Sequence, residues 1–342
     1  MSGIRIACFA VAFSLVSISQ ADSVDDLVKS KMDAEHLPGV GFFVVNPQNQ
    51  ITYRAYGVAD VRNSDPYTPK SVHRIASLSK QVCAYVTLNV IKEGKLGIDD
   101  PVSKHLPQVP ESWKSMTIRH LLGHVSGIAQ PRNWNISKEY TLEEYVALLS
   151  QNPLDNQPGE KYVYNNHGYS LLGLIAAKAM NFTLPDLAKK YIFDPVGMIS
   201  SGYYEKGVVP ERMSHAFYWE NEKWVLGEKD RPFVYHGSGG VYSTLEDMAK
   251  YEMAVRFGIL DRHVLNQQWT KSFPNLSKYG YGWNVEDDRL YHTGTTYGYT
   301  SAYIRETKSG WTILMFRNSV GQNQLAMADE ILQLWKKELA KN

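Results

Sequence analysis

Apolar residues recur at helical spacing between Val24 and Met32, directly behind Ser23. A serine in front of such a stretch is typical of a helix N-cap, so the pattern predicts a first helix that ends at the Pro-Gly pair following it. The next two apolar runs, at 40–46 and 50–59, flank a Pro-Gln-Asn turn. Two such runs around a turn predict a β-hairpin.

The middle of the chain, from residue 77 to about 233, has a mostly helical pattern. Thr141 is followed three residues later by Glu144, a capping box that predicts the start of a helix. Thr244 is expected to cap another helix that ends near residue 255. The other elements expected here are helices at 77–93, 167–180 and 184–192, and a hairpin at 216–226 that turns at 220–222.

Strand patterns return near the C-terminus, followed by an amphipathic helix. The expected strands are 279–285, 298–304 and 311–316, and the expected helix is 323–339. Strands at both chain ends with helices between them predict an α/β (α+β) fold. In this fold an antiparallel sheet is built from both ends, is flanked by terminal helices and carries a large, mostly helical insert. The expected lobes are a sheet-containing lobe of residues 22–76 plus 234–342 and a mainly helical lobe of residues 77–233, with the active site between them.

The first 21 residues have the pattern of a targeting signal. Arg5 is the only charge in them, and an apolar stretch of 13 residues follows at 6–18. Ser19 and Ala21 are the small residues of a cleavage site, so we expect a signal peptide cut after Ala21 and a periplasmic or secreted protein. The alternative is a membrane anchor, but a span needs about 20 apolar residues. We expect no stable membrane span after cleavage.

The composition is that of an ordinary globular protein of 342 residues, 44% hydrophobic and 21% charged. Lys plus Arg number 36 and Asp plus Glu 35, for a net charge of +1. No basic excess is available to neutralise a phosphate backbone, so we expect no nucleic-acid partner. The two cysteines, Cys8 and Cys83, are too few for a disulfide scaffold or a Cys-rich metal site.

Ser77 and Lys80 form an S-x-x-K motif. Near the start of a helix, positions i and i+3 lie on one face, so Lys80 can reach the Ser77 hydroxyl. A hydroxyl becomes a good nucleophile only when a neighbour takes its proton, and a lysine can do this only in its neutral form. The helix N-terminus also offers backbone N–H groups to a developing oxyanion.

Two further motifs follow in order: Y-x-N from Tyr164 to Asn166, and His-Thr-Gly from His292 to Gly294. With S-x-x-K, they resemble the serine β-lactamase and penicillin-recognising enzyme family. The stretches RHLLGHVSG at 119–127 and GGVYST at 239–244 are also similar to family sequences. The chain is most similar to the group of class C β-lactamases, D-alanyl-D-alanine carboxypeptidases and family VIII esterases.

The resemblance implies a role for each matching residue. Ser77 would be the acylated nucleophile, Lys80 its proton acceptor or partner, and Tyr164 the group that shuttles the proton and activates water. Which of Lys80 and Tyr164 is the general base stays open. The implied substrate-binding residues are Asn166, His292, Thr293 and Gly294, and the implied oxyanion hole is formed by the backbone N–H groups of Ser77 and Thr295. No metal or cofactor is implied.

One departure from the family bears on the substrate. Class C β-lactamases usually carry lysine at the position of His292, whereas the histidine form resembles D,D-carboxypeptidases and some esterases. We therefore favour a D,D-peptidase-like hydrolase acting through an acyl-serine on small-molecule or peptide substrates. A β-lactamase or a family VIII carboxylesterase is the alternative. A protonated His292 is expected to attract a substrate carboxylate.

Two alternatives to this interpretation come from other classes. His120 and His124 are four residues apart and are a candidate metal pair, but the glutamate of H-E-x-x-H is missing, so packing is the favoured interpretation. A non-catalytic penicillin-binding or scaffold protein is the second alternative. The intact set of Ser77, Lys80 and Tyr164 argues against it.

Overall fold

The computed structural model describes residues 22–106, 108–135, 138–227 and 236–340. The predicted signal peptide at 1–21 lies outside the described residues, so its cleavage stays a prediction. The described chain forms a seven-stranded antiparallel sheet built from both chain ends, in the order β3-β2-β1-β12-β11-β10-β9. This confirms the predicted mixed fold. Its strands are β1 (Gly39–Val45), β2 (Ile51–Asp60), β3 (Asp65–Pro66), β9 (Asn284–Val285), β10 (Arg289–Thr296), β11 (Tyr299–Glu306) and β12 (Thr312–Arg317).

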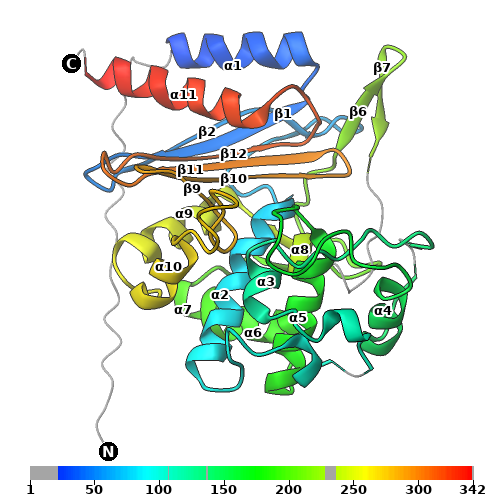
Figure 1. Cartoon of the computed structure of the whole chain (residues 1–342). Coiled ribbons are helices and arrows are strands. Elements are labelled where there is room, and N and C mark those ends of the chain that lie inside the picture. The colour runs from blue at the N-terminus through cyan, green and yellow to red at the C-terminus, as the bar shows by residue number, and fades with distance from the viewer. Residues whose placement is uncertain (1–21, 107, 136–137, 228–235, 341–342) are drawn as a thin grey trace, which may run out of the picture.

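The terminal helices α1 (Asp22–Glu35) and α11 (Gln324–Leu339) lie together on one face of the sheet (Figure 1). Both faces of β1 are buried, and this explains its continuous apolar sequence. Phe42 and Val44 pack with Val28 of α1 and Ile331 of α11. Phe43, which points the other way, belongs to the core shared with the helices on the opposite face.

That opposite face is covered by the helical part of the chain, while the two-stranded hairpin of β6 (Phe217–Glu220) and β7 (Lys223–Leu226) projects beside the large sheet (Figure 1). The helices of the helical part are α2 (Ser79–Lys92), α3 (Ile118–Leu122), α4 (Leu142–Leu149), α5 (Asn166–Met180), α6 (Leu184–Ala188), α7 (Asp194–Val196), α8 (His236–Gly239), α9 (Leu245–Arg256) and α10 (Arg262–Gln268). The shorter turns are η1 (Ala76–Leu78), η2 (Val102–Lys104), η3 (Glu111–Trp113) and the π-helical η4 (Lys189–Phe193). A third, three-stranded sheet has the order β4-β8-β5 and consists of β4 (His73–Arg74), β5 (Gly202–Tyr203) and β8 (Val241–Ser243).

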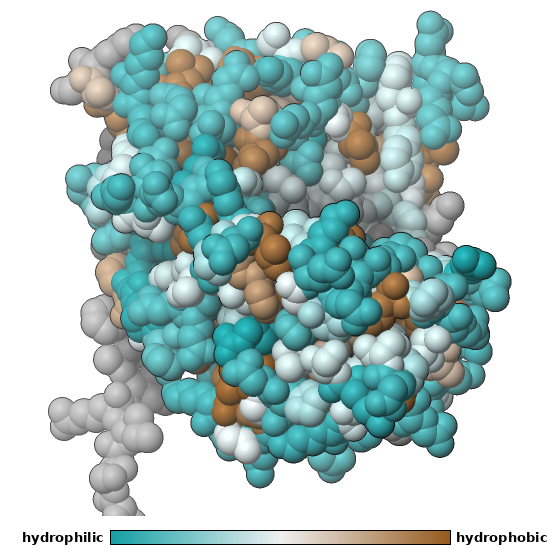
Figure 2. All heavy atoms as spheres, viewed as in Figure 1, coloured by the Kyte–Doolittle hydropathy of each residue, from teal (hydrophilic) through white to brown (hydrophobic). Residues whose placement is uncertain are grey.

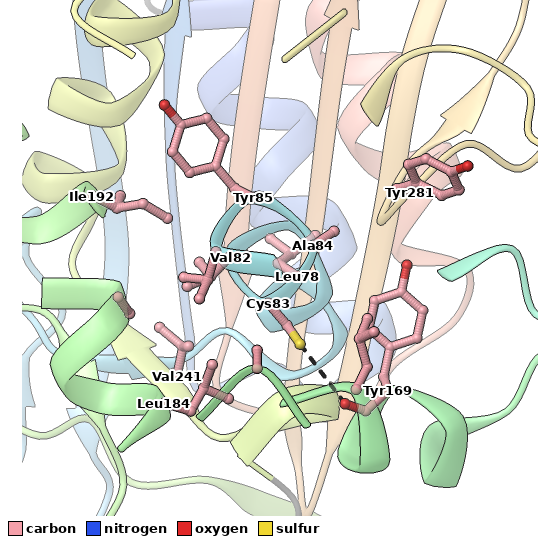
Figure 3. Close-up of a cluster of buried hydrophobic side chains, with 14 of the residues drawn as sticks. Leu78, Val82, Cys83, Ala84, Tyr85, Tyr169, Leu184, Ile192, Val241 and Tyr281 are labelled. Carbon is pink, nitrogen blue, oxygen red and sulfur yellow. Dashed lines mark hydrogen bonds between the residues drawn. The ribbon is translucent and has the colours of Figure 1, made fainter. Parts of the chain in front are cut away.

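Helix α2 runs through the centre of this core, and every residue from Ser79 to Val90 is buried. Figure 3 shows side chains leaving α2 in several directions, with Cys83 pointing toward the backbone of Tyr169 in α5. The Cys83 thiol is fully buried, and burial raises its pKa to about 12. The thiol therefore packs as a small apolar group.

Most predicted elements are confirmed within a few residues, including the capping box at Thr141, the cap at Thr244 and the C-terminal helix, which Asn323 caps. Some predictions of local structure are wrong. Ser23, expected as the N-cap of the first helix, lies inside α1, which already includes Asp22. Strand β10 was not expected, because its His-Thr-Gly-Thr-Thr sequence lacks an apolar alternation. Of the strand expected at 279–285, only β9 forms, since the aromatic residues before it pack in a buried cluster.

The viewed surface in Figure 2 is mostly hydrophilic, with hydrophobic side chains in small separate groups. Among the described helices, none is by itself long and apolar enough to cross a membrane. The segments Asn166–Met180 and Leu184–Val196 reach that length and composition only as a pair bent by 81°.

Candidate active site

Ser77 lies in the 3₁₀ turn η1, immediately before α2, and not inside the helix that the sequence predicted. Ala76, the preceding residue, has φ of +53°, a left-handed conformation that is unfavourable for alanine. The turn is held by the carbonyl oxygen of Ile75, which accepts hydrogen bonds from Leu78 N at 3.2 Å and Ser301 Oγ at 2.9 Å. Strained backbone of this kind is frequent at functional sites.

The side chain of Lys80 is completely buried and ends beside Ser77. Its Nζ lies 3.2 Å from Ser77 Oγ, 2.7 Å from Asn166 Oδ1 and 2.8 Å from the carbonyl oxygen of Ser238. The predicted contact between the serine and the lysine is therefore present. Ser238, from α8, was not predicted, because a backbone carbonyl leaves no signal in the sequence.

Helix α5 begins at Asn166, which explains how the Y-x-N motif reaches Lys80. Asn165 caps this helix through Oδ1, which accepts a hydrogen bond from Gly168 N at 3.1 Å. Tyr164 lies just before the cap, with the centre of its ring 4.7 Å from Lys80 Nζ. The residues of S-x-x-K and Y-x-N are thus brought together from two helix N-termini.

Tyr164 is 37% exposed, so solvent reaches part of its ring. The protein around it still raises the pKa of its hydroxyl above the ordinary value of 10, chiefly by desolvation, while a hydrogen bond with Ser77 opposes the rise. Tyr164 is therefore a neutral phenol near pH 7.

The His-Thr-Gly motif lies on β10, beside the turn that carries Ser77. A Cβ on Gly294 would lie 2.5 Å from the carbonyl oxygen of Ile75 and 2.9 Å from Ala76 Cβ. Only glycine permits this approach without a shift of the backbone. Thr295 is exposed, and its Oγ1 accepts a hydrogen bond from Gln324 Nε2 at 3.1 Å.

His292 is buried, which corrects the expectation of a protonated, carboxylate-attracting side chain. Its pKa is lowered to about 3, first by desolvation and then by the nearby charge of Lys80. Both ring nitrogens have partners: Nδ1 lies 2.6 Å from the carbonyl oxygen of Thr293, to which it donates, and Nε2 accepts from the Tyr279 hydroxyl at 3.0 Å. His292 is therefore neutral, and Tyr279 is a neighbour that the sequence did not reveal.

The candidate metal pair has a different use in the structure. The Nδ1 atom of His120 accepts from Thr117 N at 3.1 Å, and the Nδ1 atom of His124 accepts from Asn165 N at 3.0 Å. Across the described parts of the chain, no group of three or more His, Cys, Asp and Glu side chains is arranged to hold a metal ion.

The amino-acid sequence is similar to those of several known proteins. A family model described as Beta-lactamase matches residues 24–334. Penicillin-binding protein 4* of Bacillus subtilis is 28% identical over 297 residues, covering 78% of this chain and 65% of that protein. Protein flp of Staphylococcus aureus is 22% identical over 313 residues, covering 86% of this chain and 62% of that protein. The chain thus spans slightly less than two thirds of the length of these curated relatives.

Solved structures show the same fold. A penicillin-binding protein from Bacillus halodurans has a TM-score of 0.77 at 22% identity, covering 92% of this chain and 99% of that one. An octameric penicillin-binding protein homologue from Pyrococcus abyssi has a TM-score of 0.76 at 24% identity, covering 93% and 76%. At these identities the likeness establishes the architecture alone.

Proposed function

The chain belongs to the β-lactamase family, and on that premise we propose that it is a serine hydrolase that forms an acyl ester on Ser77. The observation that carries the proposal is the contact between Lys80 Nζ and Ser77 Oγ. Tyr164 also forms a hydrogen bond with Ser77, but as a neutral phenol it is a poorer base than a neutral lysine amine.

Three hydrogen-bonding neighbours of Lys80 suit an exchange of the serine proton. Asn166 Oδ1 and the Ser238 carbonyl oxygen can only accept, so each accepts a hydrogen bond from one N–H group of Lys80. The third position on Lys80 Nζ faces Ser77 Oγ. In the ammonium form this position carries an N–H that donates to the serine. In the neutral amine it carries a lone pair, which can take the Ser77 proton as the serine oxygen attacks.

Tyr164 is proposed to relay the proton to the leaving group. Because its pKa is raised, it begins the reaction as a phenol and is a poor first base. This favours Lys80 as the group that deprotonates Ser77. Tyr164 could then donate its own proton to the departing nitrogen or oxygen and regain one from Lys80.

The backbone N–H groups of Ser77 and Thr295 are proposed as the oxyanion hole. The close approach of Gly294 to Ile75 and Ala76 brings β10 against the nucleophile turn. Strand β9 pairs with β10 only at Leu290 and Tyr291. In the described structure no strand pairs with the rest of that edge, which suits an extended substrate.

We favour a D,D-peptidase-like substrate, supported by the names of the relatives and by histidine in place of lysine at position 292. Because His292 is neutral, a substrate carboxylate would be held by Thr293 and backbone N–H groups rather than by a histidine charge. β-Lactams and small esters are the competing substrates.

A substrate panel tests the proposal. Nitrocefin, p-nitrophenyl acetate and a D-Ala-D-Ala peptide are offered to the wild-type protein and to Ser77→Ala. Release of D-alanine by the wild type, and not by Ser77→Ala, would support a D,D-peptidase. Turnover of only nitrocefin or only the ester would move the assignment to the corresponding alternative. No turnover of any substrate would favour a binding or scaffold protein.

Export is part of the same proposal and rests on the sequence of residues 1–21. Intact mass of protein recovered outside the cytoplasm should correspond to a chain that begins at Asp22. A mass that includes residues 1–21 would favour an uncleaved anchor.

A further inference from the structure

We propose that His124 is a positioning residue that holds Tyr164 in place beside Ser77 and Lys80. The inference rests on the proposed function, because it concerns the residue assigned to proton relay. The sequence singled out His124 only as half of a candidate metal pair, and the structure gives it a different set of contacts.

His124 holds the chain on both sides of Tyr164. Its carbonyl oxygen accepts a hydrogen bond from Val163 N at 2.9 Å, and its ring Nδ1 accepts one from Asn165 N at 3.0 Å. One residue thus fixes the backbone immediately before and immediately after the tyrosine. Such a pair of bonds restricts the backbone from which the Tyr164 side chain extends.

The ring of His124 also packs against the tyrosine itself. The two ring centroids are 4.4 Å apart, with an angle of 36° between the planes. Tyr169 and Tyr279 lie on other sides of the His124 ring, at 4.8 and 4.7 Å. The imidazole is therefore enclosed by aromatic rings, and 1% of His124 is exposed.

The protonation of His124 follows from its contacts. Nδ1 accepts a hydrogen bond, and burial together with the charge of Lys80 lowers the pKa well below 6.5, so the proton of the neutral ring lies on Nε2. Nε2 is buried and has no hydrogen-bond partner among the described residues. An unpaired buried N–H is destabilising, and an apolar side chain would avoid it. A role in packing alone therefore does not account for a histidine here, whereas an acceptor at Nδ1 does.

The contacts of His124 also affect the position of Lys80. Asn165, held by His124, caps α5, and the next residue, Asn166, accepts the hydrogen bond from Lys80. His124 therefore fixes the segment that places both Tyr164 and Asn166 beside Lys80.

The backbone of His124 determines which variants give a clean test. Its φ is +58°, a left-handed conformation that glycine and asparagine tolerate better than other residues. In His124→Asn the side-chain oxygen can replace Nδ1 as acceptor. His124→Gly keeps the backbone conformation and the carbonyl acceptor but removes the ring acceptor. His120→Ala is the matched control, because it removes a nearby histidine that also accepts from a backbone N–H but does not touch Tyr164.

Two readouts are measured on the full chain. The first is the NMR signal of ¹³C-labelled tyrosine, in which Tyr164 is identified as the signal lost in Tyr164→Phe. The second is the rate at which a fluorophosphonate labels Ser77, as the serine oxygen bonds to phosphorus and fluoride leaves. Thermal unfolding of every variant reports stability separately.

The Tyr164 signal should shift or broaden in His124→Gly and stay near its wild-type position in His124→Asn. The labelling rate should fall about 10- to 100-fold in His124→Gly, because small displacements of catalytic groups have effects of this size, and return to within about fivefold in His124→Asn. In a Tyr164→Phe background, His124→Gly should lower the rate by less than about threefold further, because the two act as one unit. His120→Ala should change stability but not the labelling rate.

The proposal is overturned if Tyr164 keeps its signal in a folded His124→Gly protein, if the labelling rate does not change, or if the losses multiply in the Tyr164→Phe background. If His124→Gly does not fold, His124→Asn decides the proposal by itself: a Tyr164 signal or a labelling rate far from that of the wild type overturns it. Absence of fluorophosphonate labelling in the wild-type protein would contradict the proposed function. The NMR comparison would still decide whether His124 holds Tyr164.

Discussion

Gly294 of β10 packs directly against the carbonyl oxygen of Ile75, two residues before the nucleophile Ser77. A Cβ at position 294 would lie 2.5 Å from that oxygen, which is closer than Cβ atoms come to other heavy atoms in real structures. The strand and the turn therefore fit together only with glycine at this point. In the proposed mechanism, this contact sets the separation between the two oxyanion-hole donors.

Gly294→Ala is expected to separate β10 from the turn that carries Ser77. The rate of acyl transfer should fall by about 100-fold or more, because removing a single oxyanion-hole donor has effects of that order. Stopped-flow acylation with a chromogenic ester measures it. Gly168→Ala is the matched control, since a Cβ there would meet its nearest neighbour at 3.7 Å, an ordinary contact. Equal rates for the two variants would contradict the role given to Gly294.

Lys80→Ala and Tyr164→Phe are each expected to slow acylation strongly, and the double variant should lose little more. Groups that share one proton path are non-additive, as in other catalytic units. Single-turnover kinetics of the three variants give the coupling directly. Losses that multiply would place the two residues in separate steps.

His292 is expected to stay neutral at every pH at which the protein is folded and active. Its pKa is about 3 against an ordinary value of 6.5, so the ratio of kcat/KM for a carboxylate substrate to that for a neutral ester should not titrate with His292 between about pH 5 and 8. A ratio that falls with rising pH in the wild type, and becomes flat in His292→Asn, would show that His292 acts through its charge.

The lowered pKa of His292 also has a consequence for stability. As pH falls below about 6.5, the unfolded chain binds a proton that the folded protein excludes, so the contribution of neutral His292 to stability is lost progressively toward pH 3. Urea unfolding should show smaller loss of stability on acidification in His292→Asn than in the wild type.

Glu252 is the buried anion of an ion cluster away from the active site. It is fully buried and lies 2.7 Å from Arg256 Nε and 2.8 Å from Arg305 Nε. Glu252→Gln should lower the free energy of unfolding by about 3–5 kcal/mol, because two partly buried arginines lose a fully buried counter-ion. Glu111→Gln breaks the exposed pair with Lys114 and should cost less than about 1 kcal/mol. Similar costs for the two variants in urea unfolding would contradict this view of the cluster.

The sequence predicted the elements that carry a strong local pattern. The apolar run of β1, the Thr141–Glu144 capping box and the amphipathic α11 are visible in a few neighbouring residues. Strand β10 was missed because its buried positions include His292 and Gly294, which are not typical of a strand. Its place in the sheet is fixed by pairing with β11, which local periodicity does not report.

In the candidate site too, some features follow from sequence motifs and others depend on tertiary packing. The motifs indicated Ser77, Lys80 and Asn166, and the structure joins them across 86 residues of sequence. The Ser238 carbonyl oxygen, 158 residues from Lys80, and the burial that keeps His292 neutral depend on tertiary packing. Neither has a counterpart in the residue types themselves.

The central claim is that Ser77 forms a covalent acyl intermediate, and mass spectrometry of the trapped protein tests it most directly. The wild type and Ser77→Ala are incubated with a penicillin, quenched in acid, digested and mapped. The account predicts a mass increase equal to the whole penicillin on the peptide that contains Ser77, present in the wild type and absent from Ser77→Ala. Removal of the nucleophile should also lower turnover of any substrate by about 10⁴- to 10⁶-fold. An adduct on another residue, or equal labelling of Ser77→Ala, would contradict it.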